Sequence, residues 1–336
     1  NSPKDLAILP YMVRSVAQVA RSCGITEERF YRFLDEQLII TAQAGATQTP
    51  FIFGAAAICY PNSSNFYVPG GLIEMVFTCL DHLESNHGQW LNKQKVVQIN
   101  QNKQGYRITT DRGLEVQAPI VISNIPLWNM PDITDGQIRD YFNKESAKYS
   151  DAWGAFTMGI ALTDTLAEGL SLHHQFHLPE GHPYSDWIAR SFFVSISMRG
   201  DTQRAPEGQR VLNVSTHCSP EKWLGLDQDS YEIMKMKVQE YLFEQVQQRL
   251  PGAERAECLQ LDAATPRTWE KWVYRKDGRV GGIPQSMKRA VWDWTSPVTP
   301  FKGLYLVGDT TYPGQGIPGV TLSGINVYYR IAKDFK

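Results

Sequence analysis

Long apolar runs, paired cysteines and an excess of charge are all missing from this 336-residue chain. No stretch reaches 18 consecutive apolar residues, so no segment is typical of a membrane-spanning helix. Lysine and arginine number 33 against 35 aspartates and glutamates, and this net charge of −2 argues against a dedicated nucleic-acid-binding protein. The five cysteines are scattered without a C-x-x-C pair, which argues against disulfides and cysteine metal sites. We expect a protein that is not secreted, and that is cytoplasmic or peripheral on a membrane face.

Two familiar kinds of catalytic site are also missing. No G-x-S-x-G segment is present, so the nucleophile elbow of a serine hydrolase is not indicated. Four histidines gather near a Pro-Glu-Gly turn, but neither a cysteine nor an acid pair accompanies them. We interpret this segment as a polar surface hairpin and expect no metal. The four histidines are His173, His174, His177 and His182.

Apolar patterning predicts a folded α/β protein with a different segment inside it. Residues 50–60 are apolar but too short to span a bilayer, and they fit either a core helix or the wall of an apolar ligand cavity. A hairpin is predicted over 96–109, and the apolar run 119–124 is typical of a strand buried on both faces. Strands and one long helix are then expected between residues 153 and 294. These last elements predict an inserted α+β segment.

The C-terminal stretch is the most informative part of the sequence. A buried strand over 304–307 runs into Gly308-Asp309, then into a loop rich in glycine and proline, then into a helix over 320–333. Glycines let the backbone approach a ligand closely, and a helix N-terminus stabilises negative charge there. Asp309 could accept a hydrogen bond from the hydroxyl group of a sugar-like chain. This pattern predicts a ligand-binding turn.

Residues 314–319 match G-x-G-x-x-G, but not as a dinucleotide fingerprint. That fingerprint needs a strand directly before it, a second strand after the helix, and an acidic residue about 20 positions on. The sequence ends at Lys336 and offers neither of the last two features. We also interpret Asn1 as a cut end, because the chain starts without Met and without a signal-peptide pattern.

Gly308-Asp309 followed by residues 313–320 resembles the C-terminal FAD signature of the carotenoid isomerase and phytoene desaturase family. That family includes the retinol saturases and belongs to the flavin amine-oxidase superfamily. Segments 67–71, 265–268 and 281–284 resemble other parts of its sequence, in matching order. Family members begin with a βαβ unit whose G-x-G-x-x-G binds the FAD pyrophosphate. The resemblance therefore implies the C-terminal two-thirds of such a protein, with FAD bound weakly or not at all by this fragment alone.

The resemblance implies a set of FAD contacts but no catalytic side chain. Gly308 and Asp309 would lie against the ribityl and pyrophosphate region, and the backbone at Val96 would hold the adenine. The first turn of the last helix would lie near the pyrimidine end of the isoalloxazine, where it would stabilise an anionic reduced flavin. The residues expected along the isoalloxazine are Gly316, Pro318, Gly319 and Val320.

The implied fold is a partial FAD/NAD(P)-binding, Rossmann-like domain with an inserted substrate domain of antiparallel sheet and helices. We expect 1–65 and 131–295 to form the substrate domain, and 66–130 and 296–336 to belong to the FAD-binding domain. The implied activity of the full-length protein is FAD-dependent desaturation, saturation or isomerisation of a hydrophobic polyene, and the fragment itself would be inactive.

Two other functions stay open from the sequence. One is a flavin amine oxidase, since Tyr312 and paired tryptophans could build an aromatic cage beside the flavin. The other is a non-catalytic module that binds a carotenoid or lipid. Four tryptophans could line an apolar cleft for a polyene, although core packing is the more common role for each of them. They are Trp269, Trp272, Trp292 and Trp294. Peripheral contact with a membrane also stays open, without a basic amphipathic anchor.

Overall fold

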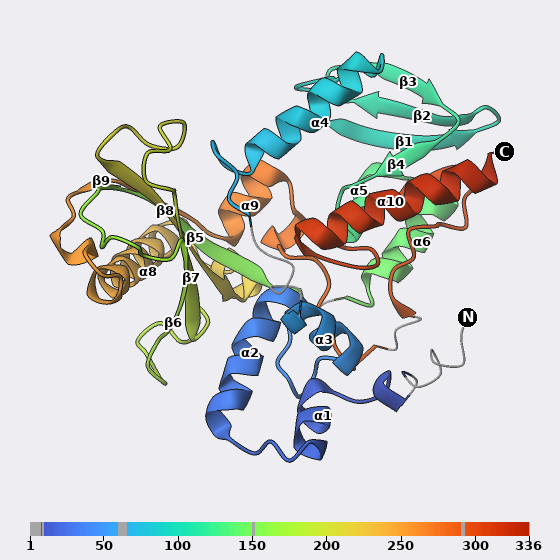
Figure 1. Cartoon of the computed structure of the whole chain (residues 1–336). Coiled ribbons are helices and arrows are strands. Elements are labelled where there is room, and N and C mark those ends of the chain that lie inside the picture. Colours follow the sequence, from blue (N-terminus) through green and yellow to red (C-terminus); the bar gives the residue numbers. More distant parts are fainter. Residues whose placement is uncertain (1–7, 9, 60–65, 150–151, 290–292, 336) are drawn as a thin grey trace. The chain divides into compact units, whose positions relative to one another are not determined.

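The computed structural model describes residues 8, 10–59, 66–149, 152–289 and 293–335 (Figure 1). It divides into two compact units, each built from separate stretches of chain. Unit 1 comprises Asn1–Ser64, Lys93–Ala152 and Gly281–Lys336, and unit 2 comprises Asn65–Asn92 and Trp153–Val280. Each unit is described by itself below.

Unit 1 contains two small sheets. In the first, β1 (Val96–Asn102), β2 (Gly105–Thr110) and β3 (Glu115–Ala118) form an antiparallel meander. In the second, β4 (Val121–Ser123) pairs in parallel with β10 (Leu304–Leu306), almost 200 residues later in the chain. The parallel pairing brings the carboxyl ends of β4 and β10 to the same edge.

The helices of unit 1 pack in two groups. One group lies with β10 around a core that includes Leu304, Leu306 and Phe142. Its elements are η3 (Leu127–Asn129), α5 (Met130–Ile133) and α6 (Gly136–Ser146). The other group packs around Val16, Leu34 and Leu38, and consists of α1 (Val16–Ser22), α2 (Glu28–Ala42) and α3 (Phe51–Cys59). The last element of the unit is α10 (Gly316–Asp334).

Unit 2 is built on one five-stranded antiparallel sheet with strand order β6-β7-β8-β5-β9. The strands are β5 (Gly154–Thr163), β6 (His173–His177), β7 (Ser191–Ile196), β8 (Gln209–Cys218) and β9 (Cys258–Ala264). Burial alternates along the whole of β5, as expected for a strand with one face on the core. That core face packs on α8 (Gln228–Arg249), whose Val238, Leu242 and Val246 are buried.

The other helices of unit 2 are short, apart from α4. They are α4 (Ile73–Ser85), α7 (Pro220–Leu224), η4 (Ala253–Arg255), α9 (Pro266–Val273) and η5 (Lys276–Gly278). The motif 265–268 has structural roles here: Thr265 and Thr268 form the capping box of α9. The guanidinium of Arg267 donates hydrogen bonds to the backbone carbonyls of Trp223 at 3.1 Å and Leu224 at 3.3 Å.

Four expectations from the sequence are corrected by the structure. The last helix begins at Gly316, not at residue 320, because a proline in the first turn sacrifices an N–H that has no helical partner anyway. The strand 119–124 was expected to be buried on both faces, but Ile122 is 51% exposed, so the face of β4 that carries Ile122 is largely open to solvent.

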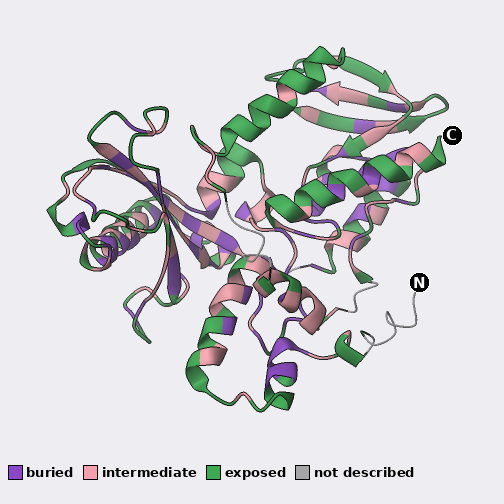
Figure 2. Cartoon of the chain, viewed as in Figure 1, coloured by how far each residue is buried: buried purple, intermediate pink, exposed green. Residues whose placement is uncertain are grey.

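The core-helix interpretation of residues 50–60 is the third correction. In α3 only Gly54 is buried, and the other described side chains are half-buried or exposed. Figure 2 shows this helix in mostly intermediate and exposed colours. The fourth correction concerns α8: Asp229 and Glu232 have the spacing of a capping box, which predicts Asp229 as the N-cap, but the helix begins at Gln228. Its N-cap is Asp227, whose side chain accepts a hydrogen bond from the Ser230 N–H at 2.9 Å.

The predicted division into FAD-binding and substrate domains differs in its boundaries from the two units. Residues 1–64 cluster with 93–152 and 281–336, whereas 65–92 cluster with 153–280. Compactness alone does not assign a ligand to either unit, so the functional division stays a prediction. Among the described residues, no helix combines the length and apolarity needed to cross a membrane.

Candidate functional site

The predicted ligand-binding turn begins at Gly308, directly after β10. Because β10 pairs in parallel with β4, this start of the turn lies next to Ser123 and Asn124 at the carboxyl end of β4. The Val307 N–H donates to the Ser123 carbonyl at 2.9 Å and extends the parallel pairing by one step. Gly308 then takes a φ of +107°, and a Cβ added there would meet only the Asn124 carbonyl oxygen, at 3.4 Å. This position therefore exposes bare backbone on one side of the sheet edge, in a conformation that favours glycine.

Buried hydroxyl groups form the hydrogen bonds that fix the conformation of this turn. The Ser323 Oγ accepts a hydrogen bond from the Gly308 N–H at 3.2 Å and lies 2.9 Å from the Thr311 Oγ1. The Thr310 Oγ1 accepts from the Leu127 N–H at 3.0 Å. Ser323, Thr310 and Thr311 are each at most 3% exposed. These bonds fix the turn against the body of unit 1, so its conformation does not depend on a ligand.

The first turn of α10 offers unused hydrogen-bond donors. Its N-cap residue is Gln315, whose side chain makes no capping hydrogen bond to the helix. Pro318 has no N–H, so the orphan donors of this turn are the N–H groups of Gly316 and Ile317. Both residues are exposed, and neither N–H has a partner among the described residues. A positive helix terminus with two such donors is suited to a partly negative acceptor.

Gly316 and Gly319 have different roles. Gly316 has a φ of +81°, and a Cβ there would find its nearest neighbour at 3.8 Å. A Cβ on Gly319 would lie 2.5 Å from the Gly314 carbonyl oxygen, so glycine is needed there to close the helix onto its own loop. Gly316 therefore leaves space open for a ligand, whereas Gly319 fills a structural need.

Asp309 lies at the junction of this turn with the segment 281–284. Gly282 has a φ of +77°, and a Cβ there would come within 2.3 Å of the Asp309 carbonyl oxygen. Asp309, Tyr312 and Gln285 help to line a cavity of only about 20 Å³. That volume suits roughly one water molecule, so the cavity itself admits no larger ligand.

An aromatic row lies beside the turn, within unit 1. The ring of Phe53 from α3 stacks on Trp294 with 4.2 Å between centroids, and Trp294 lies 6.0 Å from Tyr312. Tyr312 is 42% exposed. The other tryptophans named above differ: Trp269 donates its indole N–H to the Ala155 carbonyl in unit 2, Trp272 is exposed, and Trp292 lies outside the described residues. The apolar α3 therefore contributes to a surface next to the turn.

All seven predicted cofactor contacts lie in unit 1. Six of them follow one another from the end of β10 into the second turn of α10: Gly308, Asp309, Gly316, Pro318, Gly319 and Val320. Val96 is separate from these, since it begins β1 and packs on the core around Leu304 and Leu306. No comparison below tests these contacts, so the assignment stays a prediction.

The histidines of unit 2 do not form a cluster that could hold a metal. His173, His174 and His177 lie on β6, and His182 follows in the next loop, stacked on Tyr241. In the parts of the chain that the structure describes, no three His, Cys, Asp or Glu side chains gather around a common point. Burial lowers the pKa of His182, which suits a neutral, packed imidazole.

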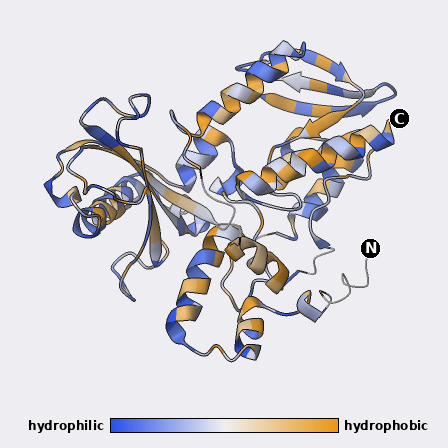
Figure 3. Ribbon diagram, viewed as in Figure 1, coloured by the Kyte–Doolittle hydropathy of each residue, from blue (hydrophilic) through white to orange (hydrophobic). Residues whose placement is uncertain are grey.

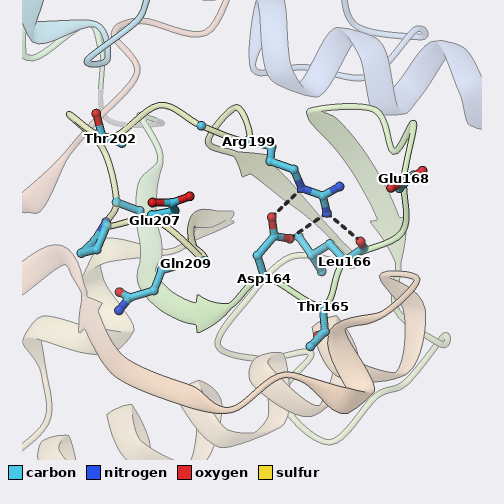
Figure 4. A pocket seen from close by; sticks show the side chains of 12 residues that line it. Asp164, Thr165, Leu166, Glu168, Arg199, Thr202, Glu207 and Gln209 are labelled. Atoms are coloured by element: carbon cyan, nitrogen blue, oxygen red, sulfur yellow. Dashed lines mark hydrogen bonds and ion pairs between the residues drawn. The ribbon is translucent and has the colours of Figure 1, made fainter.

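A cavity of about 570 Å³ in unit 2 contains none of the predicted site residues (Figure 4). The guanidinium of Arg199 forms two hydrogen bonds to the Asp164 carboxylate, at 2.6 and 3.0 Å. A third bond goes to the Leu166 carbonyl at 3.0 Å. The bonds from Arg199 hold the pKa of Asp164 below its usual range. This cavity is polar and its arginine is engaged, so we assign it no part in the predicted site.

Comparison with known protein families decides the affiliation of the chain. The family described as flavin containing amine oxidoreductase matches residues 51–331, which is most of the sequence. This chain belongs to that family. It is therefore a member of the flavin amine-oxidase superfamily, as the resemblance of segments 308–320 predicted. Its relatives include enzymes named for carotenoid isomerisation.

Two of these relatives are chloroplastic prolycopene isomerases. The carrot (Daucus carota) enzyme is 26% identical over 98% of this chain and 54% of the relative. The Arabidopsis thaliana enzyme is also 26% identical, over 98% of this chain and 56% of the relative. This flavin amine-oxidase family member thus spans about half the length of the curated relatives it matches.

Solved structures confirm the predicted fold class. An oxidoreductase from Methanosarcina mazei superposes with a TM-score of 0.63 at 18% identity, covering 98% of this chain and 73% of the other. Cyclohexylamine oxidase from Brevibacterium oxydans superposes with a TM-score of 0.59 at 9% identity, covering 97% and 69%. At these identities the similarity concerns the fold, which is the mixed α/β fold of flavin-dependent oxidoreductases.

The residues of the turn fit a flavin, the cofactor that this family implies. Gly308 and Gly316 leave open space where side chains would stand, and the Gly316 and Ile317 N–H groups are donors for the carbonyl oxygens of such a ring. Asp309 supplies a carboxylate at the strand end.

The sequence did not predict the hydroxyl and amide groups that hold the turn. They include Ser323, Gln43 and Gln285. No local pattern identifies them, because their partners are distant in the chain.

Proposed function

We propose that this chain forms part of an FAD-dependent oxidoreductase that acts on a hydrophobic polyene of the carotenoid type. The observation that carries the proposal is the open backbone at Gly308 and Gly316, next to two free N–H donors of α10. The names of the prolycopene isomerase relatives support a carotenoid substrate. The family affiliation supports flavin chemistry.

The residues of the turn would hold the cofactor in distinct ways. Gly308 would let the ribityl chain approach the end of β10, and Asp309 would accept a hydroxyl hydrogen bond from it. The Gly316 and Ile317 N–H groups would face the pyrimidine carbonyl oxygens, with Val320 one turn further along α10. Val96 would contribute a backbone contact to the adenine. When bound, flavin supplies the capacity to take or give a hydride.

The aromatic row supports an apolar substrate. Phe53, Trp294 and Tyr312 present ring surface beside the turn, and α3 adds further apolar side chains that are only half-buried. Figure 3 shows the apolar character of α3 and of parts of α10. Such a surface binds an extended hydrocarbon without hydrogen bonds and excludes water from it.

A flavin amine oxidase is the second candidate. Trp294 and Tyr312, whose ring centroids lie 6.0 Å apart with planes at 50°, are the observation in its favour. Two aromatic rings beside a flavin could receive an amine, and cation–π attraction would favour its protonated form. The open question is therefore whether an amine or a polyene reacts.

One experiment separates the two candidates. Protein from the complete gene, loaded with FAD, is incubated without oxygen with a poly-cis carotenoid in detergent micelles, and in parallel with primary amines in air. The proposal predicts a changed isomer or desaturation pattern of the carotenoid by chromatography, and no hydrogen peroxide from the amines. Peroxide release that saturates with amine, together with an unchanged carotenoid, would establish the amine oxidase instead.

A further inference from the structure

The side chain of Gln315 is turned away from the helix that it caps. Its Nε2 donates to the Ile40 carbonyl at 2.9 Å, and its Oε1 accepts from the Gln43 Nε2 at 2.9 Å. A side-chain oxygen at an N-cap usually accepts from the first turn of its own helix. Here that oxygen is engaged elsewhere, which leaves the N–H of Ile317 available, the one donor that such a cap would reach because Pro318 has no N–H.

The position of Gln43, which bonds to Gln315, is fixed by burial and by its backbone conformation. It is 3% exposed and ends α2 in the left-handed conformation, with φ +55°. Gly281 passes so close that a Cβ would lie 1.9 Å from the Gln43 Nε2 and 2.8 Å from the Gln315 Oε1. A side chain at position 281 would therefore displace the two glutamine amides, and the φ of +81° there also favours glycine.

Gln285 holds the same loop from its other side. Its backbone N–H donates to the Ala42 carbonyl at 2.8 Å, and its Nε2 donates to the Pro313 carbonyl at 2.8 Å. A Cβ on Gly314 would come within 2.5 Å of that Nε2. Carbonyl groups in the last turn of α2 thus accept hydrogen bonds from Gln315 and Gln285. These two glutamines hold the loop on both sides of Gly314.

We infer that Gln43 is a positioning residue for the flavin site: by holding the Gln315 side chain on α2, it keeps the first turn of α10 uncapped for the cofactor. This inference rests on the proposed flavin site. Because the two N–H groups face developing negative charge, they stabilise reduced flavin more than oxidised flavin. Capping the Ile317 N–H from within the chain lowers the affinity for both forms, and for the reduced form more.

A matched pair of variants tests this competition. Gln315→Ala and Gln315→Ser both lose the bonds to α2, but only serine can cap the first turn of α10. We expect Gln315→Ser to bind FAD about three- to tenfold more weakly than Gln315→Ala, the effect of about one hydrogen bond. The difference should be larger for dithionite-reduced FAD, although the serine variant has an equal or higher thermal midpoint. A merely structural role predicts that affinity follows stability.

Gln43→Met provides a second, independent test. It keeps the length of the side chain and removes the bond to the Gln315 Oε1, so that only the Ile40 carbonyl still holds Gln315 on α2 and the Oε1 can turn toward α10. We expect weaker FAD binding, again with the larger effect on reduced FAD, while Gln248→Met on the exposed surface of α8 leaves both affinities unchanged. If the protein from the complete gene shows no saturable FAD binding, both the proposed function and this inference are wrong. If it binds FAD and the serine and alanine variants are equal, only the inference is wrong.

Discussion

Ser323 in α10 and Gly308 at the end of β10 are joined by a hydrogen bond of 3.2 Å from the glycine N–H to the serine Oγ. Ser323 is fully buried and also lies 2.9 Å from the Thr311 hydroxyl. One side chain therefore ties the strand, the turn and the helix of the predicted flavin site together. Its position couples the stability of the turn to the geometry of the site.

Ser323→Ala should destabilise unit 1. Its removal leaves the Gly308 N–H without its partner, whereas the Thr311 hydroxyl keeps its bond to the Gly308 carbonyl at 2.9 Å. We expect a loss of about 1–3 kcal/mol in the free energy of unfolding, the usual cost of an unsatisfied buried group. Urea denaturation measures it. Ser146→Ala, on the partly exposed face of α6, is the control and should change stability by less than about 0.5 kcal/mol. Equal losses in both variants would contradict the role of Ser323.

Substitutions at Gly316 and Gly319 should separate binding from folding. Gly316→Ala adds a methyl group to open space at positive φ, so we expect a moderate strain of about 1–2 kcal/mol and clearly weaker FAD binding. Gly319→Val forces a side chain into the Gly314 carbonyl and should lower the thermal midpoint more than Gly316→Ala does. Thermal unfolding and FAD titration of both variants test this. A stable Gly319→Val variant would show that the helix does not close on its loop in this way.

Asp309→Ala should weaken FAD binding without unfolding the protein. A carboxylate that accepts a hydroxyl hydrogen bond contributes about tenfold or more to affinity. Asp309→Asn keeps an acceptor oxygen and should retain part of that affinity. Asp140→Ala on the exposed face of α6 is the control. Fluorescence titration with FAD gives the affinities, and circular dichroism confirms the fold. Unchanged affinity in Asp309→Ala would remove Asp309 from the site.

His217 should make unit 2 sensitive to acid. Burial between the rings of Trp153 and Phe193 lowers the pKa of His217 to about 4, against about 6.5 in an unfolded chain. The unfolded state therefore binds its proton first as the pH falls. The stabilisation from the neutral imidazole is complete above about pH 6.5 and is lost toward pH 4, by roughly 3 kcal/mol. His217→Phe should flatten this part of the stability profile. An equally steep profile in the variant would place the effect on other groups.

The elements in which apolar residues recur regularly, or form an unbroken run, could be predicted from the sequence. Strand β5 alternates between core and outer face along all of Gly154–Thr163, so its apolar pattern identifies it directly. The strand at 304–306 is short but entirely buried, and its apolar run marked it. The start of α10 was misjudged, because Gly316, Pro318 and Gly319 have the composition of a loop. A proline at position 318 is compatible both with a loop and with the first turn of a helix.

The support of the site could not be predicted, for a physical reason. Gln43 and Gln315 are 272 residues apart in the chain, and nothing local in either segment indicates the bond between them. The apolar segment at 51–59 predicted a helix correctly but not its burial. Apolarity shows that a side chain favours removal from water, not which surface covers it.

The most direct test of the flavin site is an FAD titration of the 336-residue chain followed by amide NMR, with selective labelling of glycine and isoleucine. We expect saturable binding, in the micromolar range or weaker, because this sequence contains no other G-x-G-x-x-G to bind the pyrophosphate. The amide signals of Gly308, Gly316 and Ile317 should shift together with a single dissociation constant. Saturable binding that leaves these three amides unmoved would contradict the assignment of this turn to the flavin.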